Sequence, residues 1–128
     1  MAKRRMFSRD IIETDKFLEL PIGARLLYYD LGMRADDDGF ISSPKRIINE
    51  IGVTTTDMKL LVASGYVIVF DDGIIVIRDW KINNQIRKDR HTGTIHIEHL
   101  EELNENKLKQ YIPKKNSDRI LKIESFDE

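Results

Sequence analysis

The chain contains no cysteine among its 128 residues. It therefore has no disulfide framework, no thiolate nucleophile and no cysteine-ligated zinc. It also lacks a long apolar run, because the longest one is broken by Asp71-Asp72-Gly73 and stays far below the ~20 residues of a membrane span. No apolar signal-peptide core follows Met6-Phe7. These absences predict a cytoplasmic protein that does not associate with a membrane.

Enzyme signatures are missing as well. The sequence has no glycine-rich phosphate loop, no Gly-x-Ser-x-Gly elbow and no His-Glu-x-x-His pair. We therefore expect no enzymatic activity and no cofactor. Two alternatives stay open: a weak metal site on His96 and His99, and a metal-dependent nuclease that uses Asp36, Asp37 and Asp38. Adjacent carboxylates ahead of Gly39 are also ordinary turn chemistry, which is the interpretation we favour.

The charge balance gives no bulk attraction to nucleic acid, because the formal net charge is −1 with 34% charged residues. The distribution along the chain is uneven. Cations gather in two short stretches, namely Lys3, Arg4, Arg5 and Arg9, then Lys81, Arg87, Lys88 and Arg90. Such clustering on a neutral chain predicts a polarised surface rather than a basic protein.

The first third of the chain is expected to be helical. Ser8 and Thr14 can each cap a helix, and we expect one short helix within residues 8–20. Pro21 opens a second helix that runs to about Arg34, with apolar residues at helical spacing. Residues 35–39 then turn the chain into a short strand at residues 40–42.

The stretch from Ser43 to Arg78 is the most regular part of the sequence. Ser43 is expected to cap a helix that Pro44 opens and that Gly52 should end with a positive φ. Thr54 and Asp57 form a capping-box pattern that starts the next helix, which stops at Gly65. Their expected core residues are Ile47, Ile48, Ile51, Met58, Leu61 and Val62.

Two β-branched and aromatic runs follow, at residues 66–70 and 74–78, joined by a turn sequence, Asp71-Asp72-Gly73. Helix-turn-helix followed by a β-hairpin predicts an α+β fold, predominantly helical, of the winged helix-turn-helix type. We expect this domain to span residues 1–90, with a basic N-terminal arm and with Trp80 closing the edge of the core.

Residues 91–128 form a polar extension that is too short and too polar to fold as an independent domain. We expect a short helix within residues 95–103, a turn at residues 104–106, an extended segment at residues 107–112 and a charged tail from Pro113.

A winged helix usually places its third helix in the major groove, and cations elsewhere meet phosphates. The residues that could meet DNA are Lys3, Arg4, Arg5, Lys45, Arg46, Thr54, Thr55, Thr56, Lys59, Lys81, Asn83, Asn84, Arg87, Lys88 and Arg90. On the third helix, however, Lys59 is the only cation, and the acidic hairpin turn should repel phosphate. Most of the attraction to DNA must therefore come from elsewhere, and the candidates are residues 3–5, Lys45 with Arg46, and residues 81–90.

With these segments in place, the chain resembles the N-terminal domain of replication proteins from phages and prophages of Gram-positive bacteria, the replisome-organiser or DnaD-like initiators. The motifs that carry the resemblance are MAKRRMFS, TDKFLELP, DDDGFISSPKRI and IIVIRDWKINNQIRKDR, which occur in this order within residues 1–90. The resemblance implies a winged-helix domain that takes part in binding the phage origin and in assembling the host replication machinery. It also implies that the basic N-terminus and the WKINNQIRKDR segment are hallmarks of the family.

The leading hypothesis is a non-enzymatic, phage-type DNA-binding protein that acts in replication initiation. It would bind duplex DNA, and its further partners would be host replication proteins or a second copy of the chain. The alternative is a winged-helix module for protein interaction or dimerisation, or a transcriptional regulator, with little DNA affinity of its own. A polarised positive face would favour the first, and an exposed apolar face would favour the second.

Overall fold

The computed structural model describes residues 3–115 and 117–121. Over these residues the fold is α+β, as predicted. Its elements are, in order, α1 Arg9–Ile12, α2 Asp15–Leu18, α3 Ile22–Arg34, β1 Phe40–Ile41, α4 Pro44–Ile51, α5 Thr55–Ala63, β2 Val67–Val69, β3 Ile75–Ile77, α6 Trp80–Asn83, α7 Ile97–Leu100, β4 Leu103–Glu105 and β5 Tyr111–Pro113. None of the helices in this part of the chain has the length and apolar character needed to cross a bilayer.

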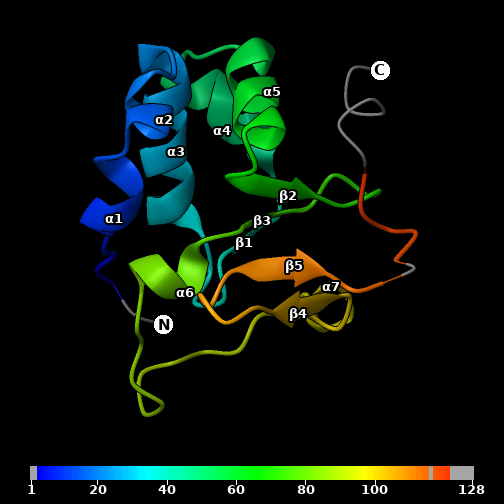
Figure 1. Cartoon of the computed structure of the whole chain (residues 1–128). Coiled ribbons are helices and arrows are strands. Elements are labelled where there is room, and N and C mark those ends of the chain that lie inside the picture. The colour runs from blue at the N-terminus through cyan, green and yellow to red at the C-terminus, as the bar shows by residue number, and fades with distance from the viewer. Residues whose placement is uncertain (1–2, 116, 122–128) are drawn as a thin grey trace.

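A small antiparallel sheet separates two groups of elements. Helices α2 to α5 lie on one side of it, and α7 with the β4–β5 hairpin lies on the other (Figure 1). The strand order is β1-β3-β2, so the first strand of the sheet pairs with the last one, with Phe40 opposite Val76 and Ile41 opposite Ile75. The β2–β3 pair forms the predicted hairpin, and Gly73 takes a φ of 88° in its turn.

The N-terminal prediction was wrong in one respect. Residues 8–20 form two four-residue helices, α1 and α2, in place of one. The break is at Thr14, whose backbone is extended at φ −75° and ψ 150° so that its hydroxyl can accept a hydrogen bond from the Phe17 backbone N–H. A residue that caps one helix cannot continue another, because the N-cap takes a non-helical conformation.

Local signals in the middle of the chain are confirmed. Pro44 occupies the first turn of α4, and Gly52 ends that helix at a φ of 79°. The capping box of α5 is complete: the Thr54 hydroxyl accepts from the Asp57 backbone N–H, and the Asp57 carboxylate accepts from the Thr54 backbone N–H. The side-chain cap expected from Ser43 is absent, since its hydroxyl makes no capping hydrogen bond.

Three aromatic rings hold α2, α3 and the start of β2 together. The Phe17 ring packs edge-on against Tyr28 and Tyr66, with centroids 5.2 and 5.5 Å away, and all three side chains are buried. The predicted core residues on α4 and α5 are also buried, apart from Ile51, which is half-buried. Burial of such residues supplies most of the stability of a domain of this size.

The C-terminal extension shares this core. Leu103 and Tyr111 are buried in the same apolar cluster as the helices, and the Tyr111 backbone N–H donates to the Arg78 carbonyl. The expected turn at residues 104–106 is instead β4 and the first residue of the hairpin turn, which runs from Asn106 to Gln110. Of the predicted charged tail, Pro113 is instead the last residue of β5, and residues 116 and 122–128 lie outside the described residues.

Trp80 is buried as predicted, and it leaves no room at Gly39. Its exposed fraction is 2%, and its indole N–H donates to the Asp37 carbonyl over 2.9 Å. Gly39 has a φ of 91°, and a Cβ added there would lie 2.6 Å from the Trp80 ring. Gly73 has a similar φ of 88° but open space around the same position.

We therefore expect Gly39→Ala to lower the free energy of unfolding by about 2–4 kcal/mol, through backbone strain and overpacking. The matched variant Gly73→Ala should lose only the strain, about 1 kcal/mol. Urea unfolding followed by Trp80 fluorescence measures both values. Equal losses in the two variants would show that the contact with Trp80 does not constrain the turn.

Candidate nucleic-acid interface

The N-terminal basic segment is anchored by a buried ion pair. The Arg5 guanidinium lies 3.0 Å from the Asp37 carboxylate, and the two side chains are 2% and 0% exposed. Arg5 also donates to the Ala35 carbonyl over 2.7 Å and stacks over the Trp80 ring at 5.1 Å. Buried charges need such pairing, so Arg5 holds the segment before it against the body of the protein.

Two asparagine side chains continue this attachment. The Met6 backbone N–H donates to Asn84 Oδ1, and the Ser8 backbone N–H donates to Asn83 Oδ1, each over 2.8 Å. The Asn83 amide in turn donates to the Tyr28 hydroxyl over 2.8 Å. Burial raises the pKa of the Tyr28 phenol despite this hydrogen bond, so the group stays neutral. These contacts bring residues 3–8 alongside α6 and the segment that follows it.

The second basic segment is tied to the same acidic turn. His91 Nε2 lies 2.8 Å from Asp38 Oδ1, and the Thr92 backbone N–H donates to Asp37 Oδ2 over 2.9 Å. Between these contacts and Asn84 the chain makes a turn in which the His91 backbone N–H donates to the Arg87 carbonyl. The segment from Asn84 to His91 is thus attached to the body at both ends.

The stretches that carry the two predicted basic clusters are therefore joined at Asn83 and Asn84. We call five of their exposed cations the basic surface, namely Lys3, Arg4, Arg87, Lys88 and Arg90, and leave out Arg9, which pairs with Glu13. Arg87 is 3.2 Å from Asp89 in an exposed pair, whereas no ion pair joins the other four to any described residue. Lys81 lies close by but pairs with Glu105 at 2.8 Å. An open groove of about 240 Å³ adjoins this surface, with Lys81, Asn84, His91 and Lys109 among its lining residues.

The remaining candidates form a separate group at the other end of the molecule. Lys45 and Arg46 are on α4, and Thr54, Thr55, Thr56 and Lys59 are on or beside the start of α5. Figure 1 shows the bend of the chain that follows α6 at the opposite end of the molecule from α4 and α5. Arg46 pairs with Glu50 at 2.9 Å, and the Thr54 hydroxyl is used in its capping box.

Three of the predicted contacts are not surface residues. Arg5, Asn83 and Asn84 are enclosed, and each is engaged by the contacts described above. Their polar side chains position the N-terminal segment and cannot reach a phosphate from these positions. Lys3, Arg4, Arg9 and the cations of residues 87–90 are the members of the two clusters that are exposed to solvent.

The acidic hairpin turn is neutralised by residues that sequence reasoning missed. Arg119 lies 3.5 Å from Asp71 and 3.1 Å from Asp72, and His99 lies 2.7 Å from Asp72. Residues 119–121 also pair with the edge of β2, where Leu121 N donates to the Val69 carbonyl. No local pattern could have found a partner that lies 47 residues away in the sequence.

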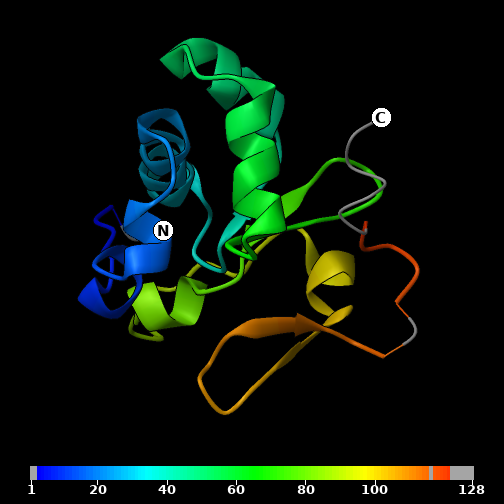
Figure 2. The same ribbon diagram turned by 45° about the horizontal axis from the view of Figure 1, so that its top comes forward.

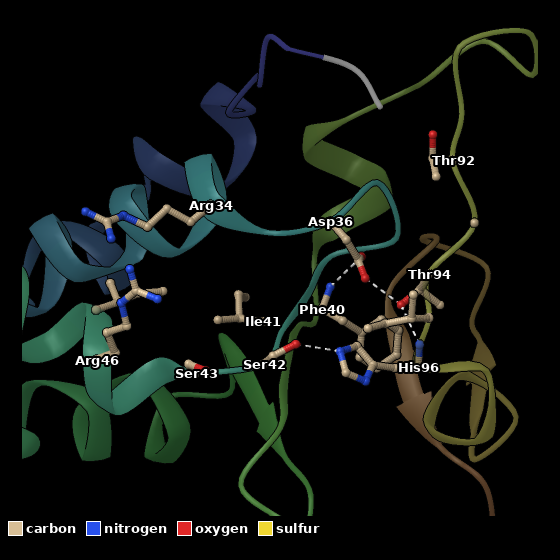
Figure 3. Close-up of a pocket in the computed structure, with 13 residues that line it drawn as sticks. Arg34, Asp36, Phe40, Ile41, Ser42, Ser43, Arg46, Thr92, Thr94 and His96 are labelled. Carbon is tan, nitrogen blue, oxygen red and sulfur yellow. Dashed lines mark hydrogen bonds between the residues drawn. The ribbon is translucent and has the colours of Figure 1, made fainter.

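A larger groove of about 490 Å³ lies beside β1 and the start of α4 (Figure 3). Phe40, Ile41 and Ile47 contribute apolar surface to it, while its polar groups already have partners. Arg34 and Arg46 both pair with Glu50, and His96 hydrogen bonds to Ser42 over 2.7 Å. The hydrogen bond from Arg34, with that from Arg46, lowers the pKa of Glu50. The groove therefore offers no unpaired charge.

The two metal hypotheses find no ligand set. His96 is bonded to Ser42, and His99 to Asp72. Asp36, Asp37 and Asp38 direct their carboxylates to separate donors, including Thr94, Thr92 and His91. Within residues 3–115 and 117–121, no three His, Asp or Glu side chains are arranged to hold a metal ion.

Comparison of the chain with models of protein families, with curated proteins and with solved structures finds no match.

Loss of the Arg5 ion pair should be costly. We expect Arg5→Met to lower the free energy of unfolding by about 3–5 kcal/mol, because it leaves a charge-free side chain beside the buried Asp37 carboxylate. The exposed neighbour gives a control, and Arg4→Met should change stability by no more than about 0.5 kcal/mol. Adding Asp37→Asn to Arg5→Met should recover part of the loss, since the pair is then neutral. A loss for Arg5→Met as small as that for Arg4→Met, in urea unfolding, would contradict the anchoring role.

Stability should also respond to acid through the hairpin turn. Partial burial alone raises the pKa of Asp72, but hydrogen bonds from His99 and the Ile74 backbone, with the charge of Arg119, outweigh it and hold the pKa below its usual value. A depressed folded-state pKa contributes stability at neutral pH that is lost as the pH falls through that value.

Asp72→Asn should therefore lower stability at pH 7 and flatten its decline in acid. Because the side chain is 40% exposed, we expect a difference of no more than about 1 kcal/mol. Thermal unfolding of both proteins over an acid pH series measures it. Parallel pH profiles for the two proteins would rule out this linkage.

Proposed function

We propose that the chain is a non-enzymatic DNA-binding protein with a winged-helix fold. The order of its elements supports the fold: α3, β1, α4 and α5 precede a β2–β3 hairpin, and β3 lies between β1 and β2. In this arrangement α4 and α5 form the helix-turn-helix around Gly52, and the β2–β3 hairpin takes the position of the wing.

The observation that carries the DNA-binding proposal is the meeting of the two basic segments. The Met6 and Ser8 backbones bond to Asn84 and Asn83, which lie 78 and 75 positions further along the chain, so the stretches that carry the two groups of cations are joined there. When exposed cations contact DNA phosphates, they displace the counterions condensed on the DNA. This release is the main source of non-specific affinity for DNA. Because the formal net charge of the chain is only −1, the chain would bind DNA only through the side that carries these cations.

The expected binding is more sensitive to salt than to sequence. Thr55 and Thr56 are exposed at the start of α5, where they could contact a DNA groove. Lys59, the one cation on α5, is half-buried. The β2–β3 turn is occupied by Arg119 and His99, so it is not available as a basic wing. Phosphate contacts position a protein without reading bases, so we expect modest sequence discrimination.

The biological setting that we propose is phage replication initiation, which would include origin binding and contact with host replication proteins. This part rests on the resemblance of MAKRRMFS, TDKFLELP, DDDGFISSPKRI and IIVIRDWKINNQIRKDR to the replisome-organiser family. Of these, MAKRRMFS and WKINNQIRKDR contain the two segments that meet on the basic surface.

A second candidate function is protein interaction or dimerisation. The observation in its favour is an apolar stripe on α3, where Ile22, Leu26 and Met33 are 77%, 44% and 52% exposed. Their spacing of four and seven residues puts them on one face of the helix. Exposed apolar faces of this kind occur where proteins bind one another.

The test of DNA binding compares two charge-matched variants. Lys88→Gln with Arg90→Gln removes two cations of the basic surface, and Lys114→Gln with Lys115→Gln removes two exposed cations elsewhere. Fluorescence anisotropy with a short duplex, over a salt series, gives the slope of log K against log salt. The first variant should reduce the magnitude of that slope by about 1.8, at roughly 0.9 per phosphate contact.

The control variant should keep the wild-type slope. Equal slopes in wild type and the Lys88 and Arg90 variant would remove the basic surface from the interface. If the wild-type chain bound no duplex or single strand at low salt but formed a dimer by light scattering, the protein-interaction function would replace DNA binding.

A further inference from the structure

The β4–β5 hairpin ends in a turn that carries a lysine, a leucine and a second lysine. Lys107, Leu108 and Lys109 are all exposed, and the Leu108 side chain keeps 69% of its surface in solvent. Figure 2 shows this hairpin projecting away from α3, α4 and α5. A single exposed apolar residue is ordinary on a protein surface. An apolar side chain between two cations at the tip of a rigid projection is a more specific combination.

The turn is held in one shape by Asn106. Its side-chain oxygen accepts from the backbone N–H groups of Leu108 and Gln110, over 2.9 and 3.0 Å, and its amide donates to the Gln110 side chain. The backbone N–H of Lys109 donates to the Asn106 carbonyl over 3.0 Å. The tip therefore presents its three side chains without a large ordering cost on binding.

Lys109 occupies an unusual backbone conformation. Its φ is 64°, and it is the one described residue other than glycine with a positive φ. This left-handed region favours glycine or asparagine, and other residues are held there at a cost. Strain of this kind is found at functional positions more often than elsewhere. The chain thus places a cation where a neutral residue would fit the backbone more easily.

The position of the hairpin puts its tip next to the basic surface. Lys81 pairs with Glu105 on β4 and lies 5.4 Å from the centre of the Tyr111 ring on β5, which fixes the base of the hairpin to α6. Lys109 lines the same open groove as Gln85, Ile86 and His91.

Charge in these segments is strongly one-sided. Residues 3–6, 84–91 and 106–110 carry exposed cations and one carboxylate, Asp89; the cations are Lys3, Arg4, Arg87, Lys88, Arg90, Lys107 and Lys109. A surface of this composition attracts a polyanion such as DNA more strongly than it attracts a protein with few acidic residues.

We propose that the hairpin tip is a further contact for duplex DNA, with Lys107 and Lys109 on phosphates and Leu108 inserted against the minor groove. DNA-bending proteins use apolar side chains in this way, flanked by cations that hold the two strands. The inference rests on the proposed DNA-binding function and extends it to a segment outside the helix-turn-helix. A second copy of the chain is the rival occupant of the tip.

The experiment separates the lysines from the leucine. Lys107→Gln with Lys109→Asn removes both charges and keeps a residue suited to the left-handed backbone at position 109. Its salt slope for a duplex should be smaller in magnitude than that of the wild type by about 1.8, while Lys114→Gln with Lys115→Gln leaves the slope unchanged.

Leu108→Ala should keep the slope and reduce the bending of a duplex labelled at both ends for energy transfer. Leu18→Ala, on a half-exposed leucine of α2, is the control and should bend DNA as the wild type does.

Thermal unfolding confirms that each variant is folded. Wild-type binding with an unchanged slope in the Lys107 and Lys109 variant would overturn this inference and leave the basic surface intact. Unchanged bending in Leu108→Ala would remove the leucine from the interface. A wild-type dimer that dissociates in Leu108→Ala, by light scattering, would assign the tip to a second copy instead. Absence of any duplex binding by the wild type would overturn both this inference and the proposed function.

Discussion

The turn formed by Asp36, Asp37 and Asp38 holds the structure together. Its groups receive hydrogen bonds or ion pairs from four parts of the chain, through Arg5, Trp80, residues 91–94 and Tyr111. Burial raises the pKa of Tyr111, so its hydroxyl remains a donor to the Asp38 carbonyl. A buried carboxylate such as Asp37 requires partners with good geometry, and the chain supplies them from its N-terminal and C-terminal parts. The segments that carry the exposed cations are therefore positioned by an acidic turn.

This arrangement separates α4 and α5, the proposed helix-turn-helix, from the residues that carry the exposed positive charge. Helices α4 and α5 are held by apolar burial at one end, with Met58 and Leu61 in the core. The basic surface is held by polar contacts at the other end, next to α6. Polar networks of this kind specify one geometry, because every member loses its partner if the segment shifts. We infer that the helical part serves as the scaffold on which the polar network places the cations.

Sequence patterns predicted the elements with local causes and missed the contacts with distant ones. The Gly52 stop, the α5 capping box and the hairpin turn each depend on a few adjacent residues, and all three were predicted correctly. Arg5, Asn83 and Asn84 were taken for surface contacts because their side chains are polar, whereas partners 30 to 78 residues away bury them. Thr14 was predicted to cap a helix, but the break that this cap causes between α1 and α2 was not predicted. Burial of a polar group depends on what the fold brings to it, and spacing along the chain does not contain that information.

The pairing of the β2–β3 turn with the end of the described chain has a structural consequence. Residues 119–121 bond to the edge of β2, and Arg119 with His99 neutralises the two carboxylates of the turn. An open edge strand invites pairing with other chains, and this cover occupies the Val69 carbonyl at the end of β2. The same cover prevents the β2–β3 hairpin from acting as a basic wing. A second hairpin, β4–β5, extends from the opposite side of the sheet and carries lysines at its tip, beside the basic surface. If a hairpin of this protein contacts DNA, the exposed lysines at the tip of β4–β5 favour that hairpin over β2–β3, whose acidic turn is paired with Arg119.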